Sequence, residues 1–341
     1  GEPFRVSRAL AFEAIFAAAR GGIGECSEQI AKKAEEIAHR LKDPYVIGLS
    51  IFARGMIANL SGNWRKAYEL CDAAADIWRE RCTGTAWEQT ISNRYRLSAL
   101  ILLGELAEVS RQVPSLLTAA LEQGNLFAAM DLRTRLNVIW LAADDPDKAR
   151  AEVVEALKSW SQEGFHLQHY VSLHALVQTE IYTGDVEVAR KHVEGEWQAL
   201  ENSQLFRTPG VALEAMQLRA RTIIATCAVR RDDSNLELVE KMARRMEKVK
   251  MSWSKPYATL LRAAVAEQRS DDAKATRLLS DAVQMFERAE MRLYAAAARR
   301  RLGEKVGGER GQQLIAEADA WMTEQKIKKP DALARMLAPG F

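Results

Sequence analysis

The sequence predicts an all-α protein in which antiparallel helical hairpins follow one another as a repeat array. Turns that stop one helix and start the next return about every 40 residues along the 341-residue chain. No segment shows a sustained alternation of apolar and polar residues with β-branched enrichment, so no sheet is expected. Hydrophobic residues make up 48% of the chain and charged residues 28%, which are values typical of globular domains.

Four of the turns share one pattern, in which an alanine stands five residues after the turn begins. They run from Gly62 to Ala67, Asp144 to Ala149, Gly184 to Ala189 and Ser270 to Ala275. A small residue in the first turn of the second helix lets two antiparallel helices approach closely. In three copies a second alanine follows seven residues later, at Ala74, Ala156 and Ala282. This spacing is half of the signature of a tetratricopeptide (TPR) hairpin, stretched here from its usual length of about 34 residues.

The predicted fold is therefore a TPR-like superhelix, or solenoid, of about eight hairpins and sixteen helices, in a single domain over residues 1–341. The expected turns lie near Gly21-Gly22, Gly62, Gly104, Asp144, Gly184, Arg230 to Asp233, Ser270 and Gly307-Gly308. At Asp43-Pro44 and Asp145-Pro146, a capping carboxylate precedes a proline that suits the first helical position.

Two repeats depart from this pattern. The third has Ala107 only three residues after Gly104, and Pro114 then falls where the second small residue belongs. Proline removes a hydrogen bond from residue i to i−4, so we expect this helix to kink or split near Pro114. The sixth repeat has Leu236 where alanine is expected, and its first helix is longer than the others.

Composition and motifs give no reason to expect catalysis, a metal or a cofactor. The net charge of +2 and the pI near 8.3 lie below the strongly basic range of nucleic-acid binders. His166, His169 and His174 lack the i, i+4 spacing of a zinc site on one helix. The glycine-rich stretch 303–311 lacks the Gly-Lys-Ser/Thr ending of a phosphate loop. Four cysteines without a C-x-x-C pair indicate reduced thiols in a cytoplasmic protein, and no apolar run is long enough to span a membrane.

One set of side chains is a candidate binding surface. Counted back from the turns, five arginines fall on the same face of the first helices: Arg54, Arg96, Arg133, Arg219 and Arg262. First helices line the concave face of TPR arrays, so one hypothesis makes these arginines a basic track that captures carboxylates or phosphates of a partner. In the alternative hypothesis, each arginine packs its stem between repeats and pairs with neighbours such as Glu88 or Asp131.

Several segments spread over nearly the whole chain resemble a known family. They are Gly84 to Glu88, Trp140 to Pro146, Trp160 to His169, Tyr182 to Asp185, Arg299 to Gly303 with Gly307-Gly308, and the ending Trp321 to Phe341. These segments are similar to the C-terminal helical region of large bacterial proteins that join a Ser/Thr protein kinase domain to a signal-transduction ATPase of the AAA/STAND type. The resemblance implies a sensor or scaffold region, which holds the ATPase closed or recruits the molecule that opens it. Kinase and ATPase motifs are absent, so we expect an excised, non-enzymatic C-terminal fragment.

The expected function is that of a protein-interaction and sensing arm, which binds a protein partner or the kinase and ATPase domains of its parent. A helical array offers a long preformed surface at little ordering cost. A competing hypothesis is a sensor that holds a small-molecule effector inside the superhelix. A weaker alternative is a nucleic-acid-binding helical repeat, which the near-neutral charge disfavours. Neither a cofactor nor membrane association is expected.

Overall fold

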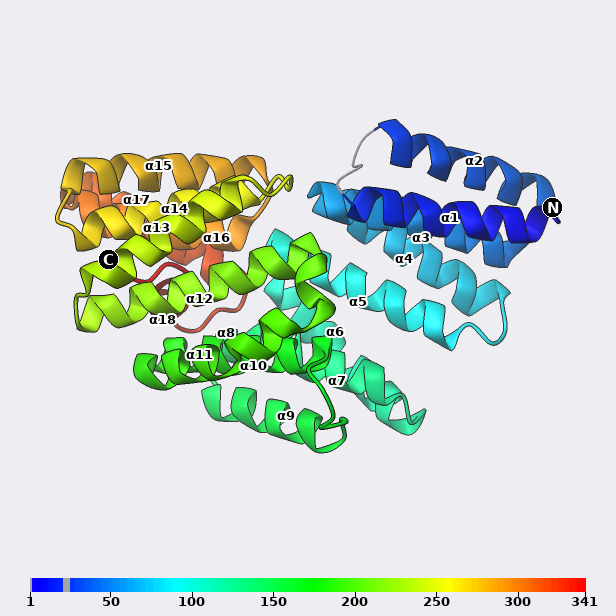
Figure 1. Cartoon of the computed structure of the whole chain (residues 1–341), viewed down its shortest axis with the longest axis horizontal. Helices are drawn as coiled ribbons and strands as arrows, with labels where there is room; N and C mark the ends of the chain where they lie inside the picture. Colours follow the sequence, from blue (N-terminus) through cyan, green and yellow to red (C-terminus); the bar gives the residue numbers. More distant parts are fainter. Residues whose placement is uncertain (1, 21–24) are drawn as a thin grey trace. The chain divides into compact units, whose positions relative to one another are not determined.

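A computed structural model describes residues 2–20 and 25–341 (Figure 1), and only the backbone of Glu25. In the described residues the chain is 83% helical and has no strand, which confirms the predicted all-α helical-repeat fold. The turn predicted at Gly21-Gly22 lies outside these residues. The chain divides into two compact units, Gly1–Leu103 and Gly104–Phe341, called unit 1 and unit 2 below. The single repeat domain over 1–341 stays a prediction.

In the described part of unit 1, consecutive helices pack against one another. The helices are α1 (Pro3–Ala19), α2 (Glu25–Leu41), α3 (Pro44–Ser61), α4 (Trp64–Arg81) and α5 (Ala86–Leu103). The Asp43 carboxylate caps α3 as predicted, because it accepts hydrogen bonds from backbone N–H groups of the first turn. The predicted alanines Ala67 and Ala74 are fully buried, and a Cβ added at Gly55 on α3 would lie 2.9 Å from the Cys71 Sγ on α4. Small residues therefore permit the close approach of these two helices.

Unit 2 continues the same hairpin pattern with more helices. They are α6 (Leu106–Glu122), α7 (Leu126–Thr134), α8 (Val138–Ala142), α9 (Pro146–Lys158), α10 (Leu167–Thr183), α11 (Val186–Asn202), the 3-10 helix η1 (Gln204–Arg207), α12 (Pro209–Val229), α13 (Asp233–Glu247), α14 (Ser254–Gln268), α15 (Asp272–Arg288), α16 (Arg292–Val306), α17 (Gly308–Glu324) and α18 (Pro330–Leu337). The longer first helix expected in the sixth repeat is α12, which spans 21 residues.

The described residues form eighteen α-helices, two more than the sixteen predicted. One extra helix arises because the first helix of the fourth hairpin is divided: α7 ends at Thr134 and α8 begins at Val138. Asn137 lies in this break, and its Nδ2 donates to the carbonyl oxygens of Arg133 (3.1 Å) and Ala149 (2.9 Å). The amide side chain thus satisfies backbone groups that an interrupted helix leaves without partners. The other extra helix is α18, close to the end of the chain.

The sequence predicts that the helix containing Pro114 kinks or splits. It is not split, so that part of the prediction is wrong, and a kink stays a prediction. α6 runs without interruption from Leu106 to Glu122 with the proline inside it. Proline removes the hydrogen bond to the carbonyl of Ser110, but Val109 and Val113 on the same helix are buried. Tertiary packing of an apolar face supplies most of the stability of a helix in a protein, and here it outweighs one lost hydrogen bond.

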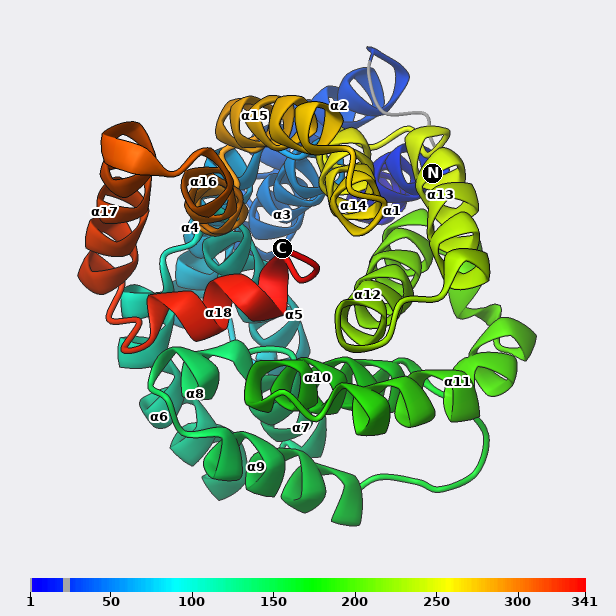
Figure 2. The ribbon, with the colours of Figure 1, turned by 90° about the vertical axis from the view of Figure 1, so that its left-hand side faces the viewer.

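Unit 2 closes on itself, because the segment that follows its last hairpin contacts the turn between α8 and α9 in its first complete hairpin. The backbone N–H of Lys328 donates to the carbonyl oxygen of Ala142 over 2.8 Å. The Lys329 Nζ lies 2.9 Å from an oxygen of the Asp144 carboxylate. Figure 2 shows the inner helices α10, α12, α14 and α16 arranged around a central space. Unit 2 is therefore a closed ring of hairpins.

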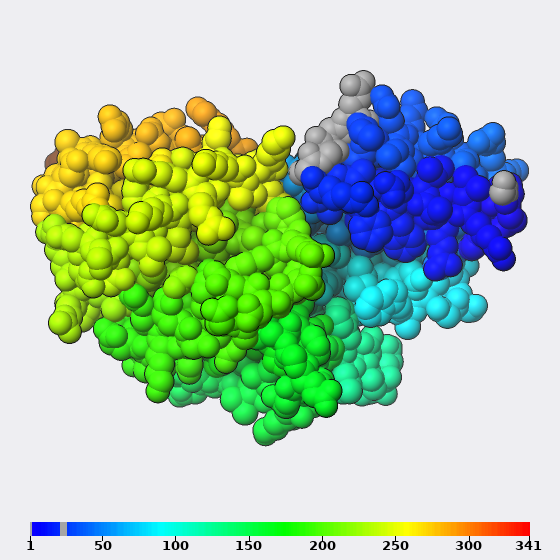
Figure 3. All heavy atoms as spheres, in the orientation of Figure 1, coloured from blue at the N-terminus to red at the C-terminus, as the bar shows by residue number. Residues whose placement is uncertain are grey.

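Residues 326–341, called the C-terminal strap below, lie across the inside of this ring (Figure 2). The strap contains α18, which packs against α10, α16 and α17. Arg301 Nε donates to the carbonyl oxygen of Ala338 over 2.9 Å, and Gln268 Nε2 donates to that of Gly340 over 2.9 Å. On the face drawn in Figure 3, the surface of unit 2 is mostly green and yellow, and the red strap is not seen. The strap fills space that the inner helices enclose.

Candidate ligand-binding site inside unit 2

The five arginines that the sequence singles out all form ion pairs with carboxylates. The pairs are Arg54–Glu35 (2.9 Å) and Arg96–Asp72 (3.0 Å) in unit 1, and Arg133–Glu152 (3.4 Å), Arg219–Glu194 (2.6 Å) and Arg262–Glu240 (3.1 Å) in unit 2. In four of the pairs the carboxylate lies on the helix that precedes the arginine's own helix, and only Arg133 pairs with the following long helix, α9. The ion pairs therefore link neighbouring helices.

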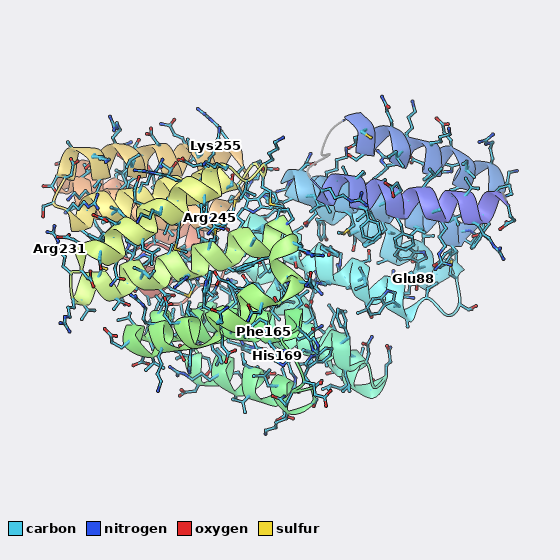
Figure 4. The ribbon with its side chains drawn as sticks, viewed as in Figure 1. Glu88, Phe165, His169, Arg231, Arg245 and Lys255 are labelled. Carbon is cyan, nitrogen blue, oxygen red and sulfur yellow. The ribbon has the colours of Figure 1, made fainter. Side chains whose placement is uncertain are left out.

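The acidic partners differ from those that the sequence suggested. Glu88, labelled in Figure 4, accepts a hydrogen bond from the Tyr45 hydroxyl over 2.8 Å. Asp131 lies 3.3 Å from Arg135. The arginine side chains are between 11% (Arg96) and 33% (Arg54) exposed. These contacts match the packing hypothesis, while capture of a partner by the five arginines stays a prediction.

The histidines of the sequence 166–174 do not share one site. The backbone N–H of His166 donates to His169 Nδ1 over 2.9 Å, next to a shallow cleft of about 520 Å³ that Phe165 and His169 line (Figure 4). His174 lies farther along α10, where the positive charges of Arg221 and Arg135 act on it. Burial, with the neighbouring His166, lowers the pKa of His169. Within residues 2–20 and 25–341, no three His, Cys, Asp or Glu side chains gather as metal ligands would.

The least expected side chain inside unit 2 is Arg221 on α12. It is 0% exposed, and its Nε, Nη1 and Nη2 atoms have no hydrogen-bond partner among the described residues. Buried polar groups in proteins are almost always hydrogen-bonded, and a buried charge without a partner is strongly unfavourable. Arg221 therefore lacks the hydrogen-bond acceptors that a buried guanidinium normally has.

The guanidinium of Arg221 borders a small cavity between the inner helices and the strap. The cavity has a volume of about 10 Å³, which is space for roughly one water molecule. It is lined by Gln217, Arg221, Ile224, Tyr257, Leu260, Leu261, Ala264, Leu337, Ala338 and Pro339. The last three residues belong to the strap and cover the arginine with apolar groups.

Other polar groups lie within electrostatic reach of Arg221. The hydroxyl of Tyr170 on α10 is buried and has no hydrogen-bond partner among the described residues. Burial raises the pKa of Tyr170, and the Glu214 carboxylate raises it further. Burial, with the positive charges of Arg221 and Arg135, lowers the pKa of half-buried His174 to about 3, so its imidazole is neutral at pH 7. The surroundings of Arg221 thus contain the Arg135 cation, the Glu214 carboxylate and the neutral side chains of Tyr170 and His174.

Sequence reasoning did not find Arg221, although it selected Arg219 two positions earlier. On a helix, two positions correspond to a rotation of about 200°, so the two side chains point to nearly opposite sides. Arg219 turns outward to Glu194, whereas Arg221 turns into the ring. The only signal in the sequence is that Arg221 interrupts a stretch that is otherwise uncharged from Ala220 to Val229.

No protein-family model matches this chain, and a search of curated proteins found no matching relative. Among the helices of the described residues, none combines the length and apolar character that crossing a lipid bilayer requires.

Proposed function

We propose that unit 2 is a non-catalytic peptide-binding module and that the C-terminal strap is its internal ligand. The observation that supports this best is how the strap is held. Gln268 at the end of α14 and Arg301 on α16 bind main-chain carbonyl oxygens of the strap, at Gly340 and Ala338. Main-chain capture does not depend on side-chain identity, so the same donors suit an extended segment of another protein.

The energetics of the ring also favour binding. The inner helices are fixed by their own hairpins and by contacts outside the strap, such as the hydrogen bond from the backbone N–H of Ala107 to Gln325 Oε1 (3.4 Å), so their surface needs little ordering when a segment binds. The strap is covalently attached, which gives it a high effective concentration at this surface. A partner segment therefore competes with the strap. It binds only where its concentration and affinity outweigh the effective concentration of the attached strap.

The test is to detach the strap without removing it. A specific protease site is inserted between Gln325 and Lys326, in the exposed turn before α18, and the folded full chain is then cleaved. We expect the cleaved segment to stay bound and to exchange with an added fluorescent peptide of the sequence 326–341. Fluorescence anisotropy measures the affinity and the exchange rate.

A matched control peptide carries Gly340→Ala. Gly340 has a φ of 97°, and a Cβ at this position would lie 2.5 Å from Ile224 Cγ2, so this peptide should bind at least about tenfold more weakly. If cleavage unfolds unit 2, or if the segment never exchanges, the strap is an integral part of the core and the proposal is wrong.

A broader proposal concerns the protein to which the module belongs. We propose that it serves as the regulatory arm of a bacterial kinase–ATPase of the type that its sequence resembles, with a TPR-like repeat as the binding surface. Its partner is then another protein or the parent's own kinase or ATPase domain, in the cytoplasm. Pull-down with the fragment, compared with a fragment in which the strap is fixed by a disulfide, tests whether a partner needs the strap to leave.

One observation favours a second candidate function, that of a small-molecule sensor. The guanidinium of Arg221 faces a cavity and has no acceptor among the described residues. A ligand that binds the folded chain stabilises it by RT ln(1 + L/Kd), where L is the free ligand concentration, so the melting temperature rises with the logarithm of ligand concentration above Kd. A salt-insensitive rise with a defined compound, without any peptide affinity in the cleaved chain, supports this second function over the first.

A further inference from the structure

The strap covers Arg221 but gives its guanidinium no hydrogen-bond acceptor. Leu337, Ala338 and Pro339 form the strap side of the cavity, and the carbonyl oxygen of Ala338 is already engaged by Arg301. None of the three has a polar side chain. The closed strap therefore leaves a fully buried guanidinium without a hydrogen-bond acceptor, and this makes the closed state less favourable than its apolar packing alone would give.

Arg221 differs in this respect from the arginines whose ion pairs link neighbouring helices. Arg219, Arg262 and Arg133 all have carboxylate partners within 4 Å. Arg135, which together with Arg221 acts on His174, lies 3.3 Å from Asp131. Among these five arginines, Arg221 is the one without an acidic partner in the described residues.

The chemistry of the group defines the ligand class. A guanidinium presents a planar fork of N–H donors that matches two oxygens of a carboxylate or a phosphate. The amide of Gln217 lines the same cavity. The buried hydroxyl of Tyr170 has no hydrogen-bond partner among the described residues, and the positive charge of Arg221 acts on its pKa. An oxyanion is the kind of group that uses the donors of Arg221 and Gln217 together.

The size of the cavity decides how such a ligand can enter. About 10 Å³ holds roughly one water molecule, whereas the smallest oxyanions have several heavy atoms. The inner helices are fixed by their hairpins, while the strap is the last segment of the ring. It is held by the burial of apolar side chains such as Leu333 and Met336 and by the polar contacts of Arg301 and Gln268. Space for an oxyanion is therefore gained where Leu337, Ala338 and Pro339 now lie.

We propose that unit 2 binds a small molecule with a carboxylate or phosphate group at Arg221, and that this binding displaces residues 337–339 and releases the C-terminal strap. The ligand thereby relieves an unpaired buried charge, which is the differential interaction that a ligand needs to shift an equilibrium between two states. This inference rests on the proposed function in one respect, since it requires that the strap can leave the ring.

The experiment measures binding and strap release together in the full chain. Inorganic phosphate, acetate, succinate and citrate are titrated at constant ionic strength with chloride as the reference anion, and binding is followed by calorimetry. Hydrogen exchange then reports the backbone amides of Lys328 and Ala338, which donate to Ala142 and Ala334 in the closed ring. We expect at least one oxyanion to bind and to lower the protection of these amides at least about tenfold.

Two arginine variants identify the site. Arg221→Gln should abolish oxyanion binding while the strap stays protected. Arg245→Gln, which removes an exposed arginine from α13 (Figure 4), should bind the oxyanion as the unmodified chain does. Equal binding by Arg221→Gln and the unmodified chain overturns the proposal.

A variant on the strap keeps the test decisive if Arg221→Gln does not fold. Pro339→Asp supplies a carboxylate beside the guanidinium, so it should raise the melting temperature and weaken oxyanion binding at least about tenfold. Pro339→Asn is the uncharged control and should do neither. Undiminished oxyanion binding by Pro339→Asp contradicts the proposal.

The remaining outcomes also separate the two claims. Absence of oxyanion binding up to about 10 mM, or binding without any loss of strap protection, overturns the inference. If the cleaved strap still exchanges with added peptide in that case, the peptide-binding function stands without the oxyanion switch. If the cleaved strap never exchanges, the proposed function fails independently of any anion.

Discussion

The backbone of Gly104 lies against the indole ring of Trp321, so close that a Cβ added at Gly104 would be 2.7 Å from the Cη2 atom of the ring. These residues belong to the first and last parts of unit 2. Gly104 also has a φ of 86°, in the region that favours glycine. The contact shows that ring closure depends on a position with no side chain, and it leads to a direct test.

Gly104→Ala should destabilise unit 2 more than the same change at an open glycine. Gly124 is the matched control, because it has a φ of 64° but no atom within 4 Å of an added Cβ. Both variants bear the strain of a left-handed alanine, about 1 kcal/mol. Gly104→Ala should lose roughly 1–3 kcal/mol more through the clash, measured by urea unfolding. Equal losses at both positions would show that the contact with Trp321 yields easily.

Arg301 should matter more to stability than an exposed arginine on the strap itself. Arg301→Met leaves the buried Ala338 carbonyl without its donor, which costs roughly 1–3 kcal/mol. It also removes one ion pair of the partly exposed Glu304, which keeps Arg300 as a partner. The control is Arg335→Met, because Arg335 pairs with Asp331 where both side chains are about half exposed. We expect that loss to stay below about 1 kcal/mol. Similar unfolding midpoints for the two variants would mean that Arg301 does not anchor the strap.

Arg219 provides a test of the two hypotheses for the five arginines that the sequence selects, namely packing between helices and capture of a partner. Its guanidinium lies 2.6 Å from Glu194 and 4.3 Å from the centre of the Trp197 ring. Arg219→Ala should therefore lower the free energy of unfolding by roughly 1–2 kcal/mol, through lost packing and lost attraction to the ring. Arg79→Ala, which removes a 58% exposed arginine that is also ion-paired, should cost less than about 1 kcal/mol. A loss at Arg219 no greater than at Arg79 favours the partner-binding hypothesis.

His174 should make unit 2 sensitive to acid. Its pKa is about 3 in the folded chain, below the ordinary value of 6.5, so the unfolded chain binds more protons between these values. Stability is therefore fully present above about pH 6.5 and falls as the pH drops toward 3, by at most about 1.4 kcal/mol per pH unit from this residue. Urea unfolding at pH 7 and pH 5 measures the loss.

The His174→Gln variant isolates this effect from the other titrating groups. It should lose less stability between pH 7 and pH 5 than the unmodified chain does. His166→Gln, which changes an exposed histidine of the same unit, serves as the control and should behave like the unmodified chain. A pH dependence unchanged by His174→Gln would show that the imidazole is not held neutral by its surroundings.

The hairpin pattern could be predicted because it depends on neighbours in the chain. Alanines such as Ala67 and Ala149 are fully buried, and Asp43 caps its helix through backbone groups of the next turn. These effects act within a few residues of one another, so their spacing can be read from the sequence. Pro114 shows the limit of such reasoning, since its local preference for a break is overcome by burial of the surrounding helix.

The candidate site could not be predicted in the same way. A sequence shows that Arg219 and Arg221 lie on different sides of a helix, but it does not show which side meets a carboxylate. Arg219 reaches Glu194 on α11, whereas Arg221 points to a space that Leu337 and Pro339 cover. Arg219 could be selected from the sequence because its distance from the next turn places it on the same helix face as other arginines of the array. Arg221 does not share that face.

By itself the sequence determined the all-α fold, most of the turns and the small residues at which helices pack, because hydrogen bonds and caps within helices join residues close in the chain. Only the tertiary structure decided that unit 2 closes into a ring, that the strap lies inside it and that Arg221 is buried without a partner. The contact between Lys328 and Ala142 uses backbone groups that every residue has, at positions far apart in the chain. Such a contact leaves no pattern in the amino-acid sequence, and it depends on the packing of all the hairpins between its two ends.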